Sequence, residues 1–458
     1  MIFGPSDDLI QIEIMQGRGK IGEDFMKIGT IAMLSLAAAA LLTAGPAAAQ
    51  PISAAIDRGD TSFVLVASAL VLFMTLPGLA LFYGGLVRAK NFLSVLMHCF
   101  AIAALVSVLW VAGGYSLAFG AEGRWIGDFS RFGLSGLHAA RIGTAIPENV
   151  FALYQMMFAI ITPGLIIGAI PERVRFGWLI IFSALWLLLV YVPVAHWIWG
   201  GGWMAGLGVL DFAGGIVVHT TAGAAALVLA LMIGPRRGFP ATLIPPHSPA
   251  LTMVGAGMLW VGWFGFNGGS ALAADASAAD AVLATHLAAA TAALTWAVLE
   301  RAKIGKATSI GLVTGAVAGL ATVTPAAGYI SPLGGVVAGG LGAAICFAAV
   351  LAVKQRWRLD DSLDVFAVHG VGGMAGSLLL APLASPALGG TAPRAAATVI
   401  GQLAAQALGV GVTLLWSLVL TFVLAKLAAL VVPMRVDAEA EHDGLDLSSH
   451  GERAYEFD

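Results

Sequence analysis

The stretch GWLIIFSALWLLLVYVPVAHWIW, residues 177–199, contains no aspartate, glutamate, lysine or arginine over 23 positions. A helix of about 20 mostly apolar residues spans the hydrocarbon core of a bilayer. The whole chain has this character, because 59% of its 458 residues are hydrophobic and only 11% are charged. A soluble domain carries roughly 25% charged residues. The composition therefore predicts a protein of the lipid bilayer, and it excludes a soluble enzyme, a nucleic-acid-binding protein and a disordered chain.

Eleven apolar stretches follow one another after residue 50 and predict an all-α polytopic membrane protein with eleven transmembrane helices. They lie near 61–87, 91–119, 149–171, 177–199, 211–234, 250–271, 278–300, 307–328, 332–353, 364–385 and 398–432. The longest polar break, 120–148, is the main hydrophilic loop. We expect the transmembrane domain to cover residues 50–435 and a polar C-terminal tail to cover 436–458.

The first 49 residues divide into two segments that we do not expect in the mature fold. Residues 26–49 combine a short basic start, an apolar run and a final GPAAA, which is the pattern of a secretory signal peptide cleaved before Gln50. Residues 1–25 carry five acidic residues, which suit neither a signal peptide nor a fold. We interpret them as a non-native upstream extension, with translation beginning at Met26.

The distribution of lysine and arginine predicts the orientation of the chain in its membrane. A cleaved signal peptide leaves the mature N-terminus outside, so the odd-numbered loops should be cytoplasmic and rich in positive charge. Twelve basic residues lie in these loops: Arg88, Lys90, Arg173, Arg175, Arg236, Arg237, Arg301, Lys303, Lys306, Lys354, Arg356 and Arg358. Four lie in the other loops: Arg124, Arg131, Arg141 and Arg394. Both signals therefore predict an outside N-terminus and a cytoplasmic C-terminus.

Three short sequence similarities recur in the same order in the two halves of the chain. The pairs are FYGG at 82–85 and FNGG at 266–269, TP at 162–163 and 324–325, and VHxxAGxA and VHxxGGxA, which begin at Val218 and Val368. An odd number of helices separates the paired spans, so we interpret the pattern as an inverted 5+5 repeat, 61–234 and 250–385, plus the helix 398–432. A substrate pathway then lies at the repeat interface, where His219 and His369 should face each other.

These two histidines lie in the middle of predicted spans, within glycine-rich sequence. An ionisable side chain at bilayer depth is costly and by default indicates function. Two facing imidazoles can share one proton while their other edges form hydrogen bonds with a small substrate. A metal site is the alternative, but it needs a third ligand, and no motif with zinc-ligand spacing is present. We therefore predict no metal and no cofactor.

Carboxylates, aromatic rings and a hydroxyl accompany the histidine pair. Asp211 and Asp364 precede His219 and His369 by eight and five residues, and each is expected to cap the helix of its histidine. For Asp211 the expected amide donors are those of Gly214 or Gly215. Aromatic side chains that converge on the mouth of a polar-lined path would form a cation–π site, to which Ser270 could add an acceptor. These aromatic residues are Tyr154, Phe158, Trp199, Trp263 and Phe266.

At these residues the sequence resembles the ammonium transporter (Amt/Mep/Rh) family, and the bacterial Amt branch in particular. The similarity runs in order from about residue 61 to residue 455. It is carried by LPGLALFYGGLVR at 76–88, FAIITP at 158–163, GAIPER at 168–173, HWIWGGG at 196–202, DFAGGIVVH at 211–219, GWFGFNGGS at 262–270, DVFAVHG at 364–370 and GLDLSSHGERAY at 444–455.

The resemblance implies a homotrimer in which each protomer has one narrow hydrophobic pore for ammonium, ammonia and methylammonium. The implied outer recruitment site consists of Trp199, Phe158 and Ser270, with Asp211 as a required carboxylate nearby. The implied gate is the stacked pair Phe158 and Phe266, and the implied pore residues are His219, His369 and Trp263. Tyr154 stands at this mouth where the family often has phenylalanine, so its hydroxyl could alter the recruitment site.

The resemblance also assigns a role to the tail. The family's cytoplasmic tail contacts neighbouring protomers and a PII signalling protein. The matching positions here are Gly444, Asp446, His450, Gly451 and Tyr455. The resemblance thus implies a regulatory C-terminal segment.

A dry pore suits the selection of ammonium over potassium, which has the same charge and a similar size. An apolar passage penalises an intact cation by several kcal/mol, and ammonium avoids this cost by releasing a proton, whereas potassium cannot. Three alternatives remain: an ammonium sensor, an Rh-like gas channel and an intramembrane metalloenzyme. A sensor is expected to carry an appended signalling domain, Rh proteins are not expected to have the tryptophan at 199, and the metalloenzyme lacks ligands.

Overall fold

The computed structural model describes residues 55–121, 123–242, 244–391 and 398–455. In this part of the chain the regular elements are helices, accompanied by two isolated β-bridges. The predicted upstream extension, the predicted signal peptide and Arg394 lie outside the described residues.

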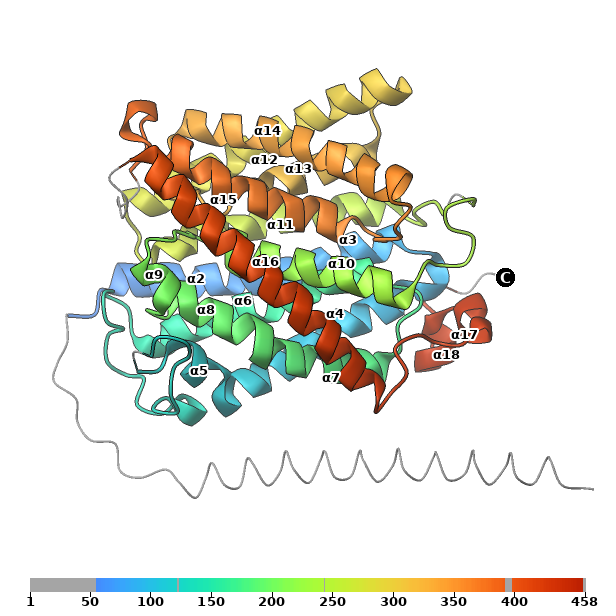
Figure 1. The fold of residues 1–458 in the computed structure, drawn as a ribbon, viewed down its shortest axis with the longest axis horizontal. Helices are drawn as coiled ribbons and strands as arrows, with labels where there is room; N and C mark the ends of the chain where they lie inside the picture. Colours follow the sequence, from blue (N-terminus) through green and yellow to red (C-terminus); the bar gives the residue numbers. More distant parts are fainter. Residues whose placement is uncertain (1–54, 122, 243, 392–397, 456–458) are drawn as a thin grey trace, which may run out of the picture. The chain divides into compact units, whose positions relative to one another are not determined.

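Figure 1 labels the α-helices. Their bounds are α2 Arg58–Phe73, α3 Ala80–Leu86, α4 Phe92–Leu109, α5 Tyr115–Phe119, α6 Glu148–Ile166, α7 Phe176–Trp186, α8 Val192–Trp199, α9 Trp203–Gly206, α10 Thr221–Ile233, α11 Pro249–Gly268, α12 Ala276–Ile304, α13 Ser309–Val323, α14 Pro332–Leu351, α15 Val371–Leu383, α16 Val399–Ala429, α17 Ala438–Asp443 and α18 Leu445–His450.

Ten helical segments among the described residues are long and apolar enough to cross a membrane. They are Arg58–Leu86, Ala89–Phe119, Glu148–Ala169, Phe176–Gly206, Gly215–Ile233, Pro249–Ala271, Ala276–Ile304, Pro332–Arg356, Phe366–Leu383 and Val399–Ala429. Each coincides with one predicted span. The prediction of eleven full-length helices is not met at the eighth stretch, 307–328, where α13 has only 15 residues. The α-helix ends two residues before Pro325, although Thr324 between them keeps helical φ and ψ angles of −48° and −48°.

Several spans contain a π-helical turn between two α-helical parts. Met74–Leu79 joins α2 to α3 and contains Pro77, whose missing N–H accounts for the wider turn. Two further π-helical turns, Gly215–Thr220 and Phe366–Gly370, lead into α10 and α15 and carry His219 and His369. The turn with His219 packs against α15, and the turn with His369 packs against α10. This reciprocal packing brings two segments 150 residues apart into contact.

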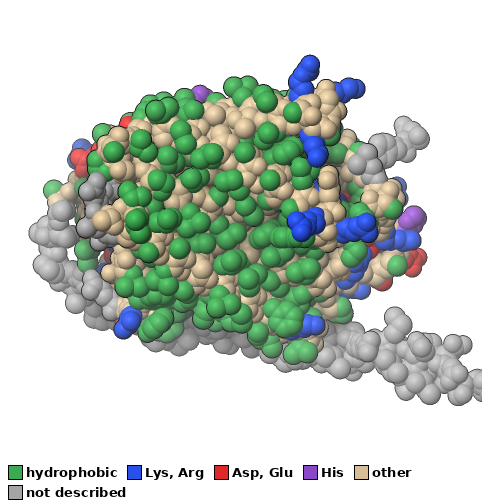
Figure 2. Space-filling view, turned by 45° about the horizontal axis from the view of Figure 1, so that its top comes forward, with side chains coloured by type: hydrophobic (Ala, Val, Ile, Leu, Met, Phe, Trp, Pro, Cys, Tyr) green, Lys and Arg blue, Asp and Glu red, His purple; other side chains and the backbone are tan. Residues whose placement is uncertain are grey.

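The spans lie side by side in one bundle, with α16 running obliquely across it against α7, α10 and α15 (Figure 1). Helix α9 lies at one end of the bundle, and α17 and α18 lie at the opposite end. We call these the Trp199 end and the tail end. In Figure 2 the side of the bundle is covered largely by hydrophobic side chains, and most lysines and arginines on this face gather toward the tail end. An apolar belt with charged ends is the surface expected of a membrane-spanning bundle.

Candidate functional site

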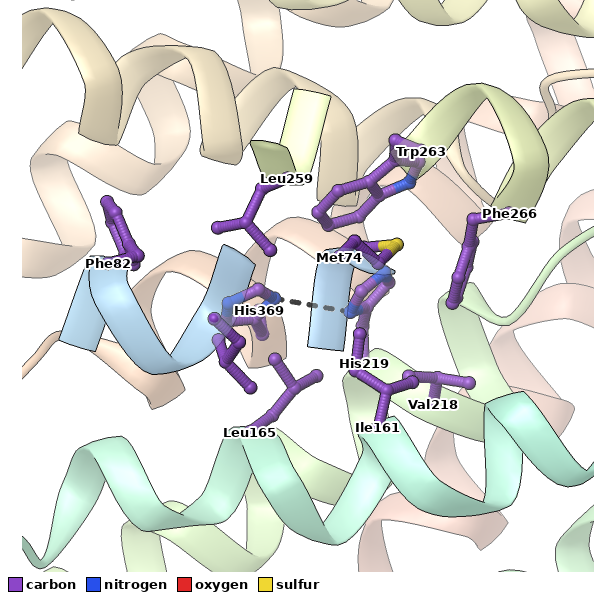
Figure 3. Close-up of a pocket in the computed structure, with 11 residues that line it drawn as sticks. Met74, Phe82, Ile161, Leu165, Val218, His219, Leu259, Trp263, Phe266 and His369 are labelled. Carbon is purple, nitrogen blue, oxygen red and sulfur yellow. Dashed lines mark hydrogen bonds between the residues drawn. The ribbon is translucent and has the colours of Figure 1, made fainter. Parts of the chain in front are cut away.

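The two predicted pore histidines meet at the centre of the bundle. The Nδ1 atoms of His219 and His369 are 3.2 Å apart, and the rings are stacked with a centroid distance of 5.2 Å (Figure 3). Both side chains are buried, with 1% and 4% of their surface exposed. Gly373 allows this approach, since a Cβ there would lie 2.6 Å from the Cβ of His219. The glycine-rich sequence around the histidines is therefore a requirement of close packing.

The geometry of the pair leaves one imidazole edge open. A neutral imidazole has one donor and one acceptor nitrogen, so one Nδ1 donates to the other. The Nε2 atom of His219 is buried and has no hydrogen-bond partner among the described residues. An unpaired buried nitrogen is costly. A small polar molecule that passes this point would satisfy it.

The cavity around the histidines is narrow and almost entirely apolar. Besides the two histidines it is lined by Met74, Leu79, Phe82, Ile161, Leu165, Val218, Leu259, Trp263 and Phe266 (Figure 3). Its free volume is about 10 Å³, roughly the space needed for one water-sized molecule. A bare cation in such a space would lose its hydration shell without gaining compensating charges, whereas a small neutral molecule fits.

A continuous series of aromatic rings leads from the Trp199 end to the histidines. Trp199 meets Phe158 edge-on at 5.7 Å, and Phe158 lies against Phe266 at 4.3 Å. Phe266 in turn stacks on His219 at 6.1 Å. Trp263 stacks on His219 at 5.5 Å, and its Nε1 donates to Thr324 Oγ1 at 2.9 Å. The structure thus brings these predicted recruitment, gate and pore residues into one series of ring contacts.

Ser270 and Tyr154 lie beside this series, at the end of α11. The Ser270 hydroxyl donates to the carbonyl of Phe266 at 2.9 Å. The Tyr154 hydroxyl lies 3.2 Å from Ser270 Oγ, and its ring meets Phe158 at 5.0 Å. Both residues predicted at the mouth are therefore in contact with the ring of Phe158 or with the backbone of Phe266.

Asp211 caps the π-helical turn that carries His219, as expected. Its two carboxylate oxygens accept hydrogen bonds of 2.7–2.9 Å from four successive amides, those of residues 214–217. Its own carbonyl accepts the Nε1–H of Trp199 at 2.8 Å. Asp211 therefore holds both the start of the His219 segment and the side chain of Trp199. This position also places its negative charge close to the aromatic site.

The capping role expected of Asp364 is wrong, because Asp361 performs it. The carboxylate of Asp361 accepts the amides of Val365 and Phe366 at 3.1 and 2.8 Å, whereas Asp364 pairs with Lys354 at 2.7 Å. Asp361 precedes His369 by eight residues, the same spacing as Asp211 before His219. That equal spacing is the signal in the sequence that could have identified it.

Several of the basic residues that predict the orientation form a buried ion-pair network at the tail end. Glu172 accepts from Arg88 at 3.0 Å and from Arg236 at 3.3 Å, and Arg236 also pairs with Asp360 at 2.9 Å. Burial raises the pKa of Glu172, but the charges of Arg236 and Arg88 outweigh this effect and lower it overall. Burial likewise raises the pKa of Asp360, and the hydrogen bonds and charge of Arg236 lower it by more, so the pKa of Asp360 is also lowered overall. The network joins the ends of several spans. No sequence motif predicted these ion pairs.

The predicted regulatory tail lies against the start of α4. Asp446 accepts the amides of Leu93 and Ser94 at 3.1 and 2.8 Å, so it caps that helix from the far end of the chain. The other tail residues lie nearby: Gly444 and Gly451, with positive φ angles, flank α18, His450 packs edge-on against Phe176, and the Tyr455 hydroxyl is 3.2 Å from His247 Nε2. The structure therefore gathers all five tail positions at the tail end.

Within the described ranges, no three histidine, cysteine, aspartate or glutamate side chains lie close enough together to hold a metal ion. The site is built from aromatic rings, two imidazoles, a hydroxyl and a capped carboxylate. Such groups can bind a cation, exclude water and relay a proton.

Comparison with known proteins gives a consistent result. The model of the Ammonium Transporter Family matches residues 62–455. The ammonium transporter of Bacillus subtilis is 43% identical over 406 residues, covering 87% of this chain and 99% of that protein. The ammonium transporter Amt1 of Archaeoglobus fulgidus is 43% identical over 401 residues, with coverage of 87% and 99%.

Solved structures agree. The crystal structure of Mep2 from Candida albicans has a TM-score of 0.77 and 35% sequence identity, covering 84% of this chain and 87% of that chain. A structure described as a sensor Amt protein has a TM-score of 0.80 and 29% identity, covering 86% and 98%. The family match over nearly all of the described chain, with relatives above 40% identity, shows that this protein belongs to the ammonium transporter family.

Proposed function

We propose that the protein recruits ammonium at the aromatic site of the Trp199 end, removes a proton from it and conducts ammonia past His219 and His369. The observation that supports this proposal most strongly is the ring series from Trp199 to His219, which ends at a pair of imidazoles 3.2 Å apart. The reaction is transport, and no covalent bond to the protein is formed.

The recruitment step uses cation–π attraction. A cation over Trp199 and Phe158 gains roughly 0.5–2 kcal/mol, more as water is removed. The carboxylate of Asp211 lies close behind, and Ser270 offers an oxygen acceptor. Together these groups raise the local concentration of ammonium at a mouth that leads only into an apolar passage.

The gate and the pore select by desolvation. Phe158 and Phe266 touch at 4.3 Å, so they must move apart for passage. Beyond them the lining is apolar, and an intact potassium ion would lose its water without replacement. Ammonia is neutral, and the imidazole edges give it hydrogen bonds along the way. The shared Nδ1 contact offers a separate path for the proton.

We extend the proposal to the assembly and its setting. The protein forms a homotrimer in the bacterial inner membrane, with the Trp199 end outside and the tail end in the cytoplasm. The two halves form an inverted repeat, in which Asp211 with His219 corresponds to Asp361 with His369, and α13 with its following turns completes an eleventh membrane crossing. The tail, which caps α4 through Asp446, is the contact for a PII signalling protein.

Uptake into liposomes tests the proposal directly. Purified protein should accumulate labelled methylammonium in a saturable manner, with competition by ammonium and no competition by potassium. Empty liposomes are the control. Uptake no faster than in empty liposomes would contradict the proposed function. The current on a supported membrane after an ammonium jump then shows whether the proton crosses with the ammonia.

A further inference from the structure

Gln406 of α16 forms hydrogen bonds with two separate segments of the chain. Its Oε1 accepts from the amide of Leu210 at 2.8 Å, and its Nε2 donates to the carbonyl of the same residue at 2.7 Å. Nε2 also donates to the carbonyl of Ser377 on α15 at 3.2 Å. The side chain is fully buried, with 0% of its surface exposed. Gln406 therefore links the loop before Asp211 to the helix that follows His369.

The side-chain amide of Gln406 uses all of its hydrogen-bonding capacity. A glutamine side chain offers two N–H donors and two acceptor lone pairs. The donors go to Leu210 and Ser377, and the lone pairs accept from Leu210 and from Gln402 Nε2, which lies 3.1 Å away. The Leu210 contacts also fix which end of the amide is the oxygen, because the reverse assignment would place donor against donor and acceptor against acceptor. A fully satisfied polar group inside an apolar bundle holds its partners in one arrangement.

The loop that Gln406 holds leads directly to the cap of the His219 segment. Leu210 is followed by Asp211, whose carboxylate accepts from four amides at the start of that segment. A displacement of Leu210 would therefore move Asp211, and the capped segment would move with it. The position of His219 thus depends on the hydrogen bonds between Leu210 and Gln406.

The other segment that Gln406 holds, α15, packs against His219. Ser377 lies one turn after Gly373 and donates its hydroxyl to the Gly373 carbonyl at 2.8 Å. Gly373 is the residue whose missing Cβ lets α15 approach His219. His369 precedes α15 in the same helical segment, Phe366–Leu383. Gln406 therefore fastens the segment of one pore histidine to the segment of the other.

The backbone of α16 also lies close to the same loop. A Cβ on Gly409, three residues after Gln406, would lie 2.6 Å from Val209 Cγ1 and 3.4 Å from Ile216 Cδ1. Val209 precedes Leu210, and Ile216 lies in the capped π-helical turn. Helix α16, which crosses α10 and α15 obliquely (Figure 1), thus contacts the loop and the turn through a glycine as well as through Gln406.

We propose that Gln406 is a positioning residue for transport, which holds the loop before Asp211 against α15 and thereby keeps His219 and His369 within hydrogen-bond distance. The inference rests on the proposed transport function and deepens it. It gives a role to α16, the helix that belongs to neither half of the proposed repeat. Gln406 acts through the two histidines, since it is absent from the lining of the cavity around them.

Methylammonium uptake by Gln406→Leu tests this inference. Leucine has a similar volume but neither the donors nor the acceptor of the amide. We expect Vmax per folded protein in liposomes to fall about 2- to 12-fold, the effect of one lost hydrogen bond at the histidine pair. Thr413→Val is the matched control, because Thr413 is a buried residue of α16 whose hydroxyl has no hydrogen-bond partner among the described residues. Its Vmax should stay at the wild-type value.

A crystal structure of Gln406→Leu separates positioning from a general loss of stability. A variant that is only less stable keeps the wild-type geometry once it is folded. Loss of the Gln406 hydrogen bonds should instead let the two histidine segments separate, so that the Nδ1 atoms lie more than about 3.5 Å apart. A separation that stays at the wild-type 3.2 Å would overturn the inference, as would an unchanged Vmax.

Gln406→Glu covers the case in which the leucine variant does not fold. The carboxyl group can still accept from Leu210 and Gln402, but it has at most one proton and cannot donate to both the Leu210 and the Ser377 carbonyls. It should change Vmax and the Nδ1 separation in the same directions by smaller amounts, and wild-type values of both would overturn the inference. Wild-type protein that takes up no methylammonium would instead count against the proposed function, and the geometric comparison would still stand.

Discussion

Gly373 offers a sharp test of the histidine pair, because it lies on α15, one turn beyond His369, and faces the segment that carries His219. A Cβ at this position would lie 2.6 Å from both His219 Cβ and the Gly215 carbonyl oxygen, whereas ordinary contact begins at 3.4 Å. Gly373→Ala must therefore push the two segments apart by 3.4 − 2.6 = 0.8 Å. If the shift follows the line between the imidazoles, the Nδ1 separation grows from 3.2 Å to about 4.0 Å, beyond hydrogen-bond range.

Two effects of different size are expected. The lost hydrogen bond is worth roughly 0.5–1.5 kcal/mol, which corresponds to about a 2- to 12-fold slower passage. Overpacking costs about 1–3 kcal/mol of stability. Methylammonium uptake per folded protein measures the first effect, and the free energy of unfolding in detergent measures the second.

Gly411→Ala is the matched control, because Gly411 lies in the transmembrane helix α16 and no described atom lies within 4 Å of a Cβ there. It should leave both uptake and stability unchanged. Wild-type uptake by a folded Gly373→Ala protein would refute the requirement for a closely spaced pair. Equal losses in both variants would show that the effect is not specific to the histidines.

The remaining predictions concern selectivity, capping and pH. His219→Asp places a carboxylate in the apolar cavity, so we expect it to admit potassium, measured as potassium flux into liposomes; continued exclusion of potassium would contradict the proposed pore role. Asp211→Asn weakens four hydrogen bonds at the start of the His219 segment and should cost about 1–3 kcal/mol of stability, with uptake reduced more than stability alone explains, because Trp199 shifts with it. Glu172→Gln breaks a buried ion pair and should cost about 3–5 kcal/mol at neutral pH. Because the pKa of Glu172 is lowered in the fold, its stabilising contribution is complete above the ordinary glutamate value of about 4.3 and is lost as the pH falls through the lower folded value. The difference between wild type and Glu172→Gln should therefore shrink only below about pH 4, and a difference that vanishes near pH 6 would contradict the ion-pair assignment.

Much of the site could be predicted because its signals are local. Asp211 caps amides three to six residues away, so its role was visible from the sequence DFAGG. The short α13 was not predicted, because the uninterrupted apolar character of 307–328 gives no sign of an end at Val323. The two capping aspartates show the limit of such inference. Asp361 and Asp364 lie three residues apart, and the choice between them depends on the partner that Lys354 provides from the preceding helix.

The sequence by itself determined the membrane location, nearly all of the spans and the family, because apolar composition and short motifs depend on neighbouring residues only. The tertiary structure alone decided which distant side chains meet. It placed the imidazoles of His219 and His369 within hydrogen-bond distance, paired the basic residues at the tail end with Glu172 and Asp360, and directed the Tyr154 hydroxyl to the end of α11. These contacts join residues separated by 64 to 150 positions in the sequence. The physical reason is that helix packing sets their distances, and no local pattern in the chain specifies how two helices pack.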